Sequence, residues 1–345
     1  MNESVLAAFG FQPRQVNLER IGSGLINHTW KVFRDDQVFI LQKINEDVFS
    51  SPDDIAANLD LVSAYLQEHH PEYTFIAPIR SGQEGSLVYR QGEGYYRLFP
   101  FVCGSHSKDT AETSLQAYEA ARQFGKFTRL LSGFDTNQLR ITIPFFHDLE
   151  YRYNEFVKAL NAGDAARIRE SREVSHLLLG KNHIVETFRK IKADPSFHTR
   201  VTHHDTKISN VLFDESGKGI CVIDLDTLMP GYFISDLGDM MRTYLSPVSE
   251  EEKETERIFI RDDFYQAIVE GYMDEMKDEL TDKEKDHFFY SALFMTYMQA
   301  LRFLTDHLKN DQYYHPSYPG QNLVRARNQS TLLLRMLGKE KTLRV

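Results

Sequence analysis

Charged and amide side chains interrupt an otherwise apolar segment, VTHHDTKISNVLFDESGKGICVIDLDT, at residues 201–227. His203, Asp205 and Asn210 follow the spacing H-x-D-x-x-x-x-N, and Lys207 lies two residues after Asp205. Phosphoryl transfer requires a carboxylate at the attacking hydroxyl, oxygen ligands for Mg²⁺ and positive charge beside the moving phosphate. Because Mg²⁺ prefers hard oxygen ligands and retains waters, one asparagine and one or two aspartates suffice. The segment therefore predicts a phosphoryl-transfer site.

Two further aspartates follow the apolar run ICVI, Asp224 directly and Asp226 after one more residue. The preceding VLFD and ESGKG segments predict a hairpin that returns Asp224 to the neighbourhood of Asn210. Capping of a turn is the alternative role for Asp205 and Asn210. For Asp226, both metal ligation and structural capping remain open.

The residues around this segment are expected to shape the loop rather than to react. His203 is expected to hydrogen-bond within the loop, and His204 has no assigned role. Asp236 and Asp239, in ISDLGDMM, are expected to begin a helix and brace the loop, because aspartate is favoured at helix N-termini.

The elements before this segment predict a small sheet with one helix. Residues 17–44 predict a β-ribbon, because apolar residues alternate in HTWKVF and QVFILQKI around an RDD turn. A helix is predicted from Ser51, with Pro52 in its first turn. The runs TFIAPIRS, SLVYRQ and GYYRLFPFV, which begin at residues 74, 86 and 94, are expected to be short strands.

From about residue 112 the apolar residues recur at helical spacing. The predicted hairpin interrupts these helices, which then continue through an aromatic-rich helix at residues 287–308. The fold class is therefore α+β. We expect a small N-terminal β-rich lobe at residues 1–101 and a larger, mostly helical C-terminal lobe at residues 102–345.

Composition places the chain among globular proteins. Its 345 residues are 41% apolar and 12% aromatic, which is enough for two domains with sizeable cores. The net charge of −10 argues against nucleic acid as a partner, because a phosphate backbone requires positive charge. Cys103 and Cys221 each lie beside valine and are expected to be buried, reduced thiols rather than a disulfide framework.

Targeting and membrane signals are weak. The N-terminal residues lack the basic start and long apolar core of a signal peptide. The helix at 287–308 contains Gln299, Arg302 and Asp306, which favours burial within the protein over a membrane span. We therefore expect a soluble cytoplasmic protein without a membrane partner, and its oligomeric state is not predicted.

Two nested resemblances follow from the motifs. HHDTKISN followed by VIDLD resembles the aminoglycoside phosphotransferase and choline kinase family, relatives of the protein kinases, over most of the chain. More narrowly, HHDTKISNVLFD, VIDLDTLMPGYFISDLGDMMRTYLSP and YMQALRFLTDHL resemble the N-acetylhexosamine 1-kinases, which phosphorylate the anomeric hydroxyl of N-acetylglucosamine or N-acetylgalactosamine.

The resemblance implies a bilobal protein-kinase-like fold, with ATP and Mg²⁺ as cofactors and a small sugar as substrate. It implies that Asp205 is the catalytic base and that Lys207 contacts the transferred phosphate. Asn210 and Asp224 would be the magnesium ligands, with Asp226 as a further candidate.

The nucleotide is expected in the N-terminal lobe, which the resemblance implies is nucleotide-binding. Gly22, Ser23 and Gly24 form a turn that could cover the ATP phosphates with backbone N–H groups, although the full G-x-G-x-x-G pattern is absent. A plain hairpin turn is the alternative. Lys43 falls where the family has its phosphate-binding strand lysine, and a solvated strand-end lysine is the alternative.

The adenine is expected at the strand that resembles the connection between lobes. The backbone around Phe99 and Phe101 would meet the adenine edge, while core packing is the alternative for both rings.

The acceptor site is expected near Asp205. Arg302 lies in the most apolar helix of the chain, where an unpaired charge is costly. An ion pair with Asp306 is the alternative to a role in substrate binding. The resemblance favours the substrate role for Arg302 and also implies that His28, in LINHTW, approaches the sugar.

Other functions leave different signatures. A choline kinase would need an aromatic cage, and an aminoglycoside kinase would need an acidic patch where this chain has a basic C-terminal tail. A homoserine kinase stays open, as does an inactive kinase-like binding module, although the intact motif residues argue against the latter. A protein kinase is disfavoured because D-F-G and A-P-E are missing after Asp224.

Overall fold

The computed structural model describes residues 3–12, 16–21, 27–82 and 84–343, which form two compact units. Unit 1 comprises Met1–His106, Gly133–Pro144 and Leu212–Pro230. Unit 2 comprises Ser107–Ser132, Phe145–Val211 and Gly231–Val345. The division of the chain into functional lobes at residues 1–101 and 102–345 stays a prediction.

Unit 1 is built on an antiparallel sheet with the order β1-β2-β3-β5-β4 among the described residues. The strands are β1 Asn17–Ile21, β2 His28–Arg34, β3 Gln37–Lys43, β4 Val88–Arg90 and β5 Gly94–Pro100. The ribbon predicted for residues 17–44 is confirmed as β1 to β3. Asp35 makes the turn between β2 and β3 with φ 50°, in the left-handed region that aspartate tolerates.

The two faces of this sheet carry different side chains. One face packs against α1 (Glu3–Ala8), where Leu6, Leu41 and Leu98 are buried in one hydrophobic cluster. Gln42 and Arg97 are partners across β3 and β5. Because successive side chains alternate between faces, this pair lies on the face opposite Leu41 and Leu98.

The remaining elements of unit 1 surround this sheet. The predicted helix is α2 (Pro52–His69), with Pro52 in its first turn. Residues 74–81 do not form the predicted strand, because Pro78 cannot donate to a ladder. The segment contacts β5 through the Ile79 N–Leu98 O bond of 2.7 Å and forms an isolated bridge between Ser81 and Gly85. A short 3-10 helix occupies Thr136–Gln138.

The hairpin predicted after the catalytic loop is confirmed. β7 (Val211–Phe213) pairs with β8 (Gly219–Val222), followed by a 3-10 turn at Leu225–Thr227 and β9 (Met229–Gly231). Cys221 on β8 is buried, as expected. Cys103 is exposed, which corrects the expectation for that thiol, since it lies in the turn after β5 rather than within the strand.

Unit 2 is mostly helical. Its helices are α3 Ser114–Leu130, α4 Leu149–Ala162, α5 Ala165–Glu170, α6 Arg172–Leu179, α7 His183–Ala193, α8 Phe233–Tyr244, α9 Asp262–Met276, α10 Asp282–Lys285, α11 Phe288–Leu308, α12 Gln321–Gly338 and α13 Glu340–Leu343. It also contains β6 (Arg200–Thr202) and 3-10 turns at Ile208–Asn210 and Thr255–Arg257.

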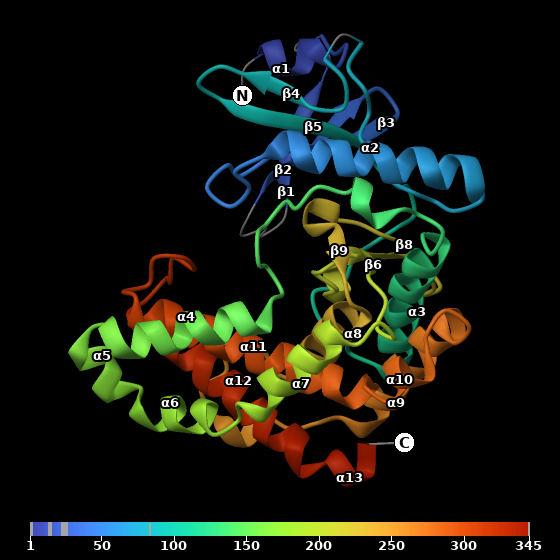
Figure 1. Ribbon diagram of the computed structural model, residues 1–345. Helices are drawn as coiled ribbons and strands as arrows, with labels where there is room; N and C mark the ends of the chain where they lie inside the picture. Colours follow the sequence, from blue (N-terminus) through green and yellow to red (C-terminus); the bar gives the residue numbers. More distant parts are fainter. Residues whose placement is uncertain (1–2, 13–15, 22–26, 83, 344–345) are drawn as a thin grey trace. The chain divides into compact units, whose positions relative to one another are not determined.

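The aromatic-rich helix α11 forms the core of unit 2. It packs against α4, α8 and α12, and Figure 1 shows α4 and α11 side by side. Gly238 permits the close approach of α8, because a Cβ at this position would collide with the carbonyl oxygen of Ser291 on α11. No helix within the described ranges is long and apolar enough to cross a membrane.

Candidate active site

The loop between β6 and β7 brings three predicted residues together in unit 2. Lys207 Nζ lies 2.9 Å from Asp205 Oδ1. Asn210 Nδ2 donates to Asp205 Oδ2 at 3.1 Å and to the Asp205 carbonyl at 2.8 Å. The carboxylate of Asp205 is therefore held from both sides while it stays partly exposed, as a base that receives a substrate proton must be.

Helix α8 braces this loop through two buried carboxylates. Asp236 accepts hydrogen bonds from the backbone N–H groups of His203, at 2.9 Å, and His204, at 2.8 Å. Asp239 accepts from the N–H of Thr206, at 2.9 Å. The expected bracing role of Asp236 and Asp239 is confirmed. The spacing of the loop is thus fixed by a helix about 30 residues further along the chain.

The loop charges perturb one another. Burial alone would raise the pKa of Asp205, but the Lys207 ammonium outweighs it, so the pKa lies below its ordinary value. The Asp205 carboxylate in turn raises the pKa of Lys207. Asp236 differs, because burial raises its pKa to about 6 despite its backbone hydrogen bonds. Asp205 is therefore ionised, and Lys207 charged, throughout the neutral range.

His204, which directly precedes Asp205, begins a stack of three rings. Its backbone is left-handed, with φ 67°, and its buried side chain stacks on His147 with ring centroids 5.0 Å apart. His147 stacks in turn on Phe146 at 4.4 Å. Burial lowers the pKa of His204 to about 3 and that of His147 well below its ordinary value, so both imidazoles are neutral.

Arg302 of α11 lies at the other end of this stack. Its guanidinium carbon is 5.0 Å from the Phe146 ring centroid, 5.7 Å from that of Tyr313 and 5.6 Å from that of Tyr314. Its hydrogen bond goes to the neutral Gln299, at 3.2 Å. Each face-on contact of this kind contributes about 0.5–2 kcal/mol.

The predicted alternative, an ion pair between Arg302 and Asp306, is not formed. Asp306 Oδ1 accepts the backbone N–H of Tyr313 at 2.8 Å, and its Oδ2 accepts that of Tyr314 at 2.9 Å. Asn322 Nδ2 also donates to Oδ2, at 2.9 Å. Asp306 therefore fixes the loop whose tyrosines cover Arg302, and it does not neutralise the guanidinium.

A second arginine adds to this charge. Arg152 of α4 hydrogen-bonds the Phe146 carbonyl, and burial followed by repulsion from Arg302 lowers its pKa to about 10. Within the described part of the chain, no carboxylate forms an ion pair with Arg152 or Arg302. The sequence analysis missed Arg152 and Phe146, because they lie about 50 residues before the motif in chain order.

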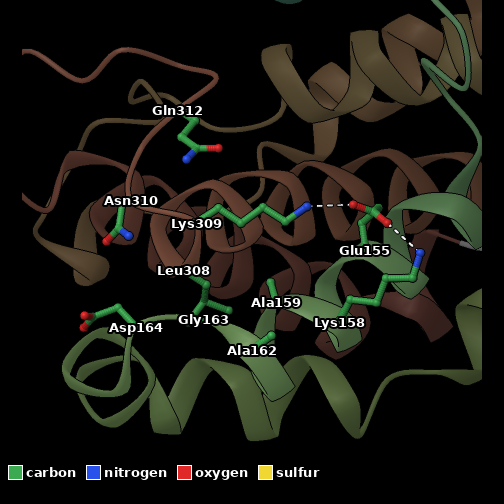
Figure 2. Close-up of a pocket in the computed structure, with 10 residues that line it drawn as sticks. All are labelled: Glu155, Lys158, Ala159, Ala162, Gly163, Asp164, Leu308, Lys309, Asn310 and Gln312. Carbon is green, nitrogen blue, oxygen red and sulfur yellow. Dashed lines mark hydrogen bonds and ion pairs between the residues drawn. The ribbon is translucent and has the colours of Figure 1, made fainter.

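A pocket in unit 2, lined by residues from α4 and from the end of α11, contains two lysines that can be compared with Arg152 and Arg302. This pocket is a hollow of about 310 Å³ at the ends of α4 and α11, and Figure 2 shows the residues that line it. Its two lysines point toward one carboxylate, with Glu155 at 2.7 Å from Lys309 and 3.0 Å from Lys158. None of the residues predicted for the site lines this hollow. Its charges are internally compensated, in contrast to Arg152 and Arg302.

The predicted metal ligands divide between the units, with Asn210 in unit 2 and Asp224 and Asp226 in unit 1. Both hydrogen bonds of the Asn210 side chain use Nδ2, and none within the described residues involves its Oδ1, which suits a metal-ligating oxygen. Asp224 has φ 61° and ψ 61°, a strained conformation typical of functional sites. These oxygen donors fit Mg²⁺, which needs few protein ligands. The described residues contain no group of three or more His, Cys, Asp or Glu that could hold a metal.

The carboxylate of Asp226 is bound to two other side chains of unit 1. Its Oδ1 lies 2.5 Å from Arg97 Nη1, and its Oδ2 accepts from Asn27 Nδ2 at 2.7 Å. The sequence analysis named neither Arg97 nor Asn27. This geometry favours the structural alternative that the sequence left open for Asp226.

The predicted nucleotide residues lie in unit 1. Gly22, Ser23 and Gly24 fall outside the described residues. Phe99 lies on the same face of β5 as Arg97. The guanidinium carbon of Arg97 is 5.1 Å from the ring centroid of Phe99. Phe101 follows β5, and Lys31 Nζ lies 4.9 Å from its ring. Contact of their backbone with adenine stays a prediction.

Lys43 and His28 are partners across β3 and β2, so they share a face. That face also bears Leu41, because residues two apart on a strand point the same way. It is the face opposite Gln42 and Arg97. The roles of Lys43 at phosphate and of His28 at the sugar stay predictions.

Comparison with known proteins identifies the chain's relatives. The model of the phosphotransferase enzyme family (APH) matches residues 17–272, which is most of the chain and includes the whole catalytic loop and hairpin. The chain belongs to this family. It is therefore a phosphotransferase by family, as the H-x-D-x-x-x-x-N motif predicted.

Solved structures show the same fold. A microcompartment-associated aminopropanol kinase matches with a TM-score of 0.61 at 15% identity, over 99% of this chain and 97% of that one. A choline kinase from Cryptosporidium parvum Iowa II matches with 0.59 at 12% identity, over 96% and 92%. A spectinomycin phosphotransferase in complex with ADP and spectinomycin matches with 0.53 at 16% identity, over 96% and 98%. The predicted α+β, protein-kinase-like fold is confirmed.

Proposed function

We propose that this protein transfers the γ-phosphate of ATP to the anomeric C1 hydroxyl of an N-acetylhexosamine, N-acetylglucosamine or N-acetylgalactosamine, with Mg²⁺ as cofactor. The family supports phosphoryl transfer, and the complexes of a structural neighbour with ADP support an adenine nucleotide. The acceptor is the part of the proposal that depends on this chain's own residues.

The observation that carries the acceptor assignment is the uncompensated charge of Arg152 and Arg302 in the same unit as Asp205. Several structural neighbours are named for aminopropanol, choline or ethanolamine, all of which are cations at neutral pH. Two guanidinium groups without a carboxylate repel such acceptors, since an interaction between like charges is strengthened by partial burial. They favour a neutral acceptor rich in hydrogen-bond acceptors, such as the hydroxyl and amide oxygens of an N-acetylated sugar.

The aromatic rings of this region support the same choice. A quaternary ammonium is bound by a cage of aromatic faces. Here the faces of Phe146, Tyr313 and Tyr314 are already turned to the guanidinium of Arg302. The protein's own cation therefore occupies the cage that choline would need, and the arginine presents donors to a sugar instead.

In the proposed mechanism Asp205 accepts the proton of the acceptor hydroxyl. Lys207 and Asn210 fix its two oxygens, and each oxygen keeps a further lone pair for that hydroxyl. A low pKa suits this role, because proton transfer is late in the loose transition state and an anomeric hydroxyl is more acidic than an ordinary alcohol.

The charged groups around this base supply the electrostatic part of catalysis. The half-exposed ammonium of Lys207 would lie beside the transferred phosphoryl group, and it is held there by Asp205. Bound Mg²⁺ would neutralise developing charge on the phosphate oxygens, and Asn210 and Asp224 are the residues that would hold it. Within unit 2, helix α8 fixes the backbone of the loop that carries Asp205 before substrate arrives, which limits the reorganisation that the reaction requires.

A panel of acceptors tests the proposal. ADP release would be measured with N-acetylglucosamine, N-acetylgalactosamine, glucose, choline, ethanolamine, 1-amino-2-propanol, homoserine and spectinomycin, all with ATP and Mg²⁺. We expect turnover with one or both N-acetylhexosamines and a phosphorus NMR signal from an anomeric phosphate. Turnover with an amine but neither sugar would overturn the acceptor assignment, and nucleotide binding without any turnover would indicate an inactive binding module.

The role of Asp205 has its own test. Asp205→Asn keeps the shape and the hydrogen bond from Asn210, but it removes the base, so we expect kcat to fall by about 10²–10⁴-fold. Binding of ADP, measured by calorimetry, should be nearly unchanged. Full activity of the variant would rule out Asp205 as the base.

A further inference from the structure

The buried carboxylate of Asp226 joins three elements of unit 1. It is 2% exposed, and its oxygens are shared between Arg97 of β5, at 2.5 Å, and Asn27, at 2.7 Å. Its backbone carbonyl accepts the hydroxyl of Thr142 at 2.9 Å. A magnesium ligand must turn at least one oxygen to the ion, whereas both oxygens of Asp226 are turned to protein partners and the residue is almost fully buried.

The guanidinium of Arg97 is also fully used in contacts within the protein. Its Nε and Nη2 both donate to Gln42 Oε1, at 3.0 and 2.9 Å, and the side chain is 3% exposed. Gln42 is on β3, next to Lys43, and points to the opposite face of the sheet. Gln42, and not Lys43, therefore lies on the face of the sheet that meets Asp226. The positive charge on that face is the guanidinium of Arg97 on β5.

Asn27 extends the network toward the strand β2. Its Oδ1 accepts the backbone N–H of Asn45 at 3.0 Å, while its Nδ2 donates to Asp226. It directly precedes His28, the first residue of β2, and directly follows the segment at 22–26. One carboxylate thus fixes the position of Asn27, whose chain neighbours include the predicted glycine turn.

We propose that Arg97, Asp226 and Asn27 are positioning residues, which hold Asp224 in place for the metal and nucleotide, and that Asp226 is not itself a magnesium ligand. Asp224 is two residues before Asp226 and has the strained φ of 61°. Such a conformation persists only where neighbouring contacts hold it. The proposal rests on the proposed function in that Asp224 acts there as a ligand of Mg²⁺.

The contacts of this network given above do not include Lys43. The sequence analysis assigned the phosphate-binding cation of the sheet to Lys43 by resemblance. Lys43 lies on the α1 face, where a Cβ at Gly94 would be 3.5 Å from its Cε. Arg97 instead contacts the loop directly. We therefore expect Arg97→Met to raise the metal requirement.

The experiment measures metal-dependent nucleotide binding rather than turnover. ADP affinity would be determined by calorimetry as a function of Mg²⁺ concentration in the wild type, Asp226→Asn, Arg97→Met and the double variant. If Arg97 and Asp226 position Asp224, each single variant raises the Mg²⁺ concentration required by at least about tenfold. The double variant is no worse than either single one, because the two act as a unit.

Direct ligation by Asp226 gives a different pattern. Asp226→Asn would then raise the metal requirement, whereas Arg97→Met would leave it unchanged or lower it by freeing the carboxylate. That pattern would overturn the proposal. Electron paramagnetic resonance with Mn²⁺ as the probe ion provides a second readout, and the expected order of the variants is the same.

A matched control separates positioning from general stability. Arg200 and Glu284 of unit 2 form another buried pair, with Nη1 and Oε1 2.6 Å apart. Glu284→Gln should lower the melting temperature without changing the metal requirement. An equal change in Glu284→Gln and Asp226→Asn would reduce the network to a structural pair and overturn the proposal.

Asn27→Ala keeps the test available if the ion-pair variants fail to fold. Asn27 is partly exposed, and its loss leaves the Arg97–Asp226 pair intact. We expect a smaller increase in the metal requirement, of about three- to tenfold, and an unchanged metal requirement would count against the proposal. Absence of metal-dependent ADP binding in the wild type would overturn this proposal and the proposed function together. Binding that none of the variants weakens would overturn the positioning role alone.

Discussion

Arg97 in unit 1 and Arg302 in unit 2 each lie against aromatic rings, but only Arg97 is paired with a carboxylate. Arg97 is neutralised by the carboxylate of Asp226 and bound by Gln42. Arg302 lies among three aromatic rings, with a neutral amide as its hydrogen-bond partner and a second arginine nearby. A compensated charge completes the fold, whereas an uncompensated one leaves donors for a ligand.

The largest expected effect comes from breaking the compensated pair. Arg97→Met leaves the Asp226 carboxylate buried without its counter-charge, so the free energy of unfolding should fall by about 3–5 kcal/mol. Urea denaturation followed by circular dichroism would measure the change. Adding Asp226→Asn should restore part of the loss, because the double variant has no uncompensated charge. A loss below about 1 kcal/mol for Arg97→Met would show that the pair is more hydrated than its burial indicates.

Arg302→Met should reverse the pattern, with a large loss of activity and a smaller loss of stability than Arg97→Met. A hydrogen bond to a charged group contributes about 1.5–3 kcal/mol, so kcat/KM for the acceptor should fall by about 10- to 100-fold. The melting temperature should fall less than in Arg97→Met, because relief of the repulsion with Arg152 offsets part of the lost contacts between Arg302 and the aromatic rings. Steady-state kinetics with the preferred sugar and a thermal melt would test both expectations.

Lys309→Met is the matched control for Arg302→Met. Lys309 lies directly after α11 and is paired with Glu155 of α4, at 2.7 Å. Its loss should leave the KM of the acceptor unchanged, since this cation belongs to the hollow of Figure 2. If both variants lose activity equally, the position of the charge on the helix does not matter and the acceptor role of Arg302 is wrong.

The pair of Lys207 and Asp205 falls between these extremes, because it is compensated but partly exposed. Its expected signature is a change in pH dependence. Lys207 keeps the pKa of Asp205 below the ordinary value of 3.8, so the acid limb of kcat/KM caused by protonation of this base lies below that pH. In Lys207→Met, the largest opposition to burial is lost and the pKa of Asp205 rises, although His203 and the hydrogen bond from Asn210 still lower it, so the limb should move to higher pH.

This test depends on the pH at which the acid limb of kcat/KM falls, and not on the height of the plateau of kcat/KM. Lys207→Met also removes charge from the transferred phosphate, so its plateau should be lower at every pH. Profiles normalised to their plateaus would be compared over the range in which circular dichroism shows both proteins folded. Coincident profiles would mean that Lys207 does not set the protonation of Asp205.

The sequence predicted what is local in the chain. The catalytic loop, its hairpin and the bracing aspartates lie within 40 residues, and each follows from spacing, alternation or helix-start preference. The contacts of Arg97 and Arg302 do not follow from local spacing in this way. The Asn27–Asp226 bond joins residues 199 apart, and Arg97 and Gln42 are 55 apart. Strand alternation showed that Gln42 and Lys43 point to opposite faces, but not which face meets the metal loop. Arg302 was predicted as a buried charge in need of a partner, yet only tertiary contacts show that Asp306 is used elsewhere.

The smallest expected effect distinguishes the ring of Tyr314 from its hydroxyl. Gln299 Nε2 donates to this hydroxyl at 3.2 Å, while the ring covers Arg302. Tyr314→Phe removes one neutral hydrogen bond, which contributes about 0.5–1.5 kcal/mol, so kcat/KM for the acceptor should fall less than about tenfold. Tyr314→Ala also removes the ring and should approach the loss seen in Arg302→Met. If Tyr314→Phe is as damaging as Arg302→Met, the hydroxyl contacts the acceptor directly. The acceptor site would then include Tyr314 as well as the uncompensated arginines.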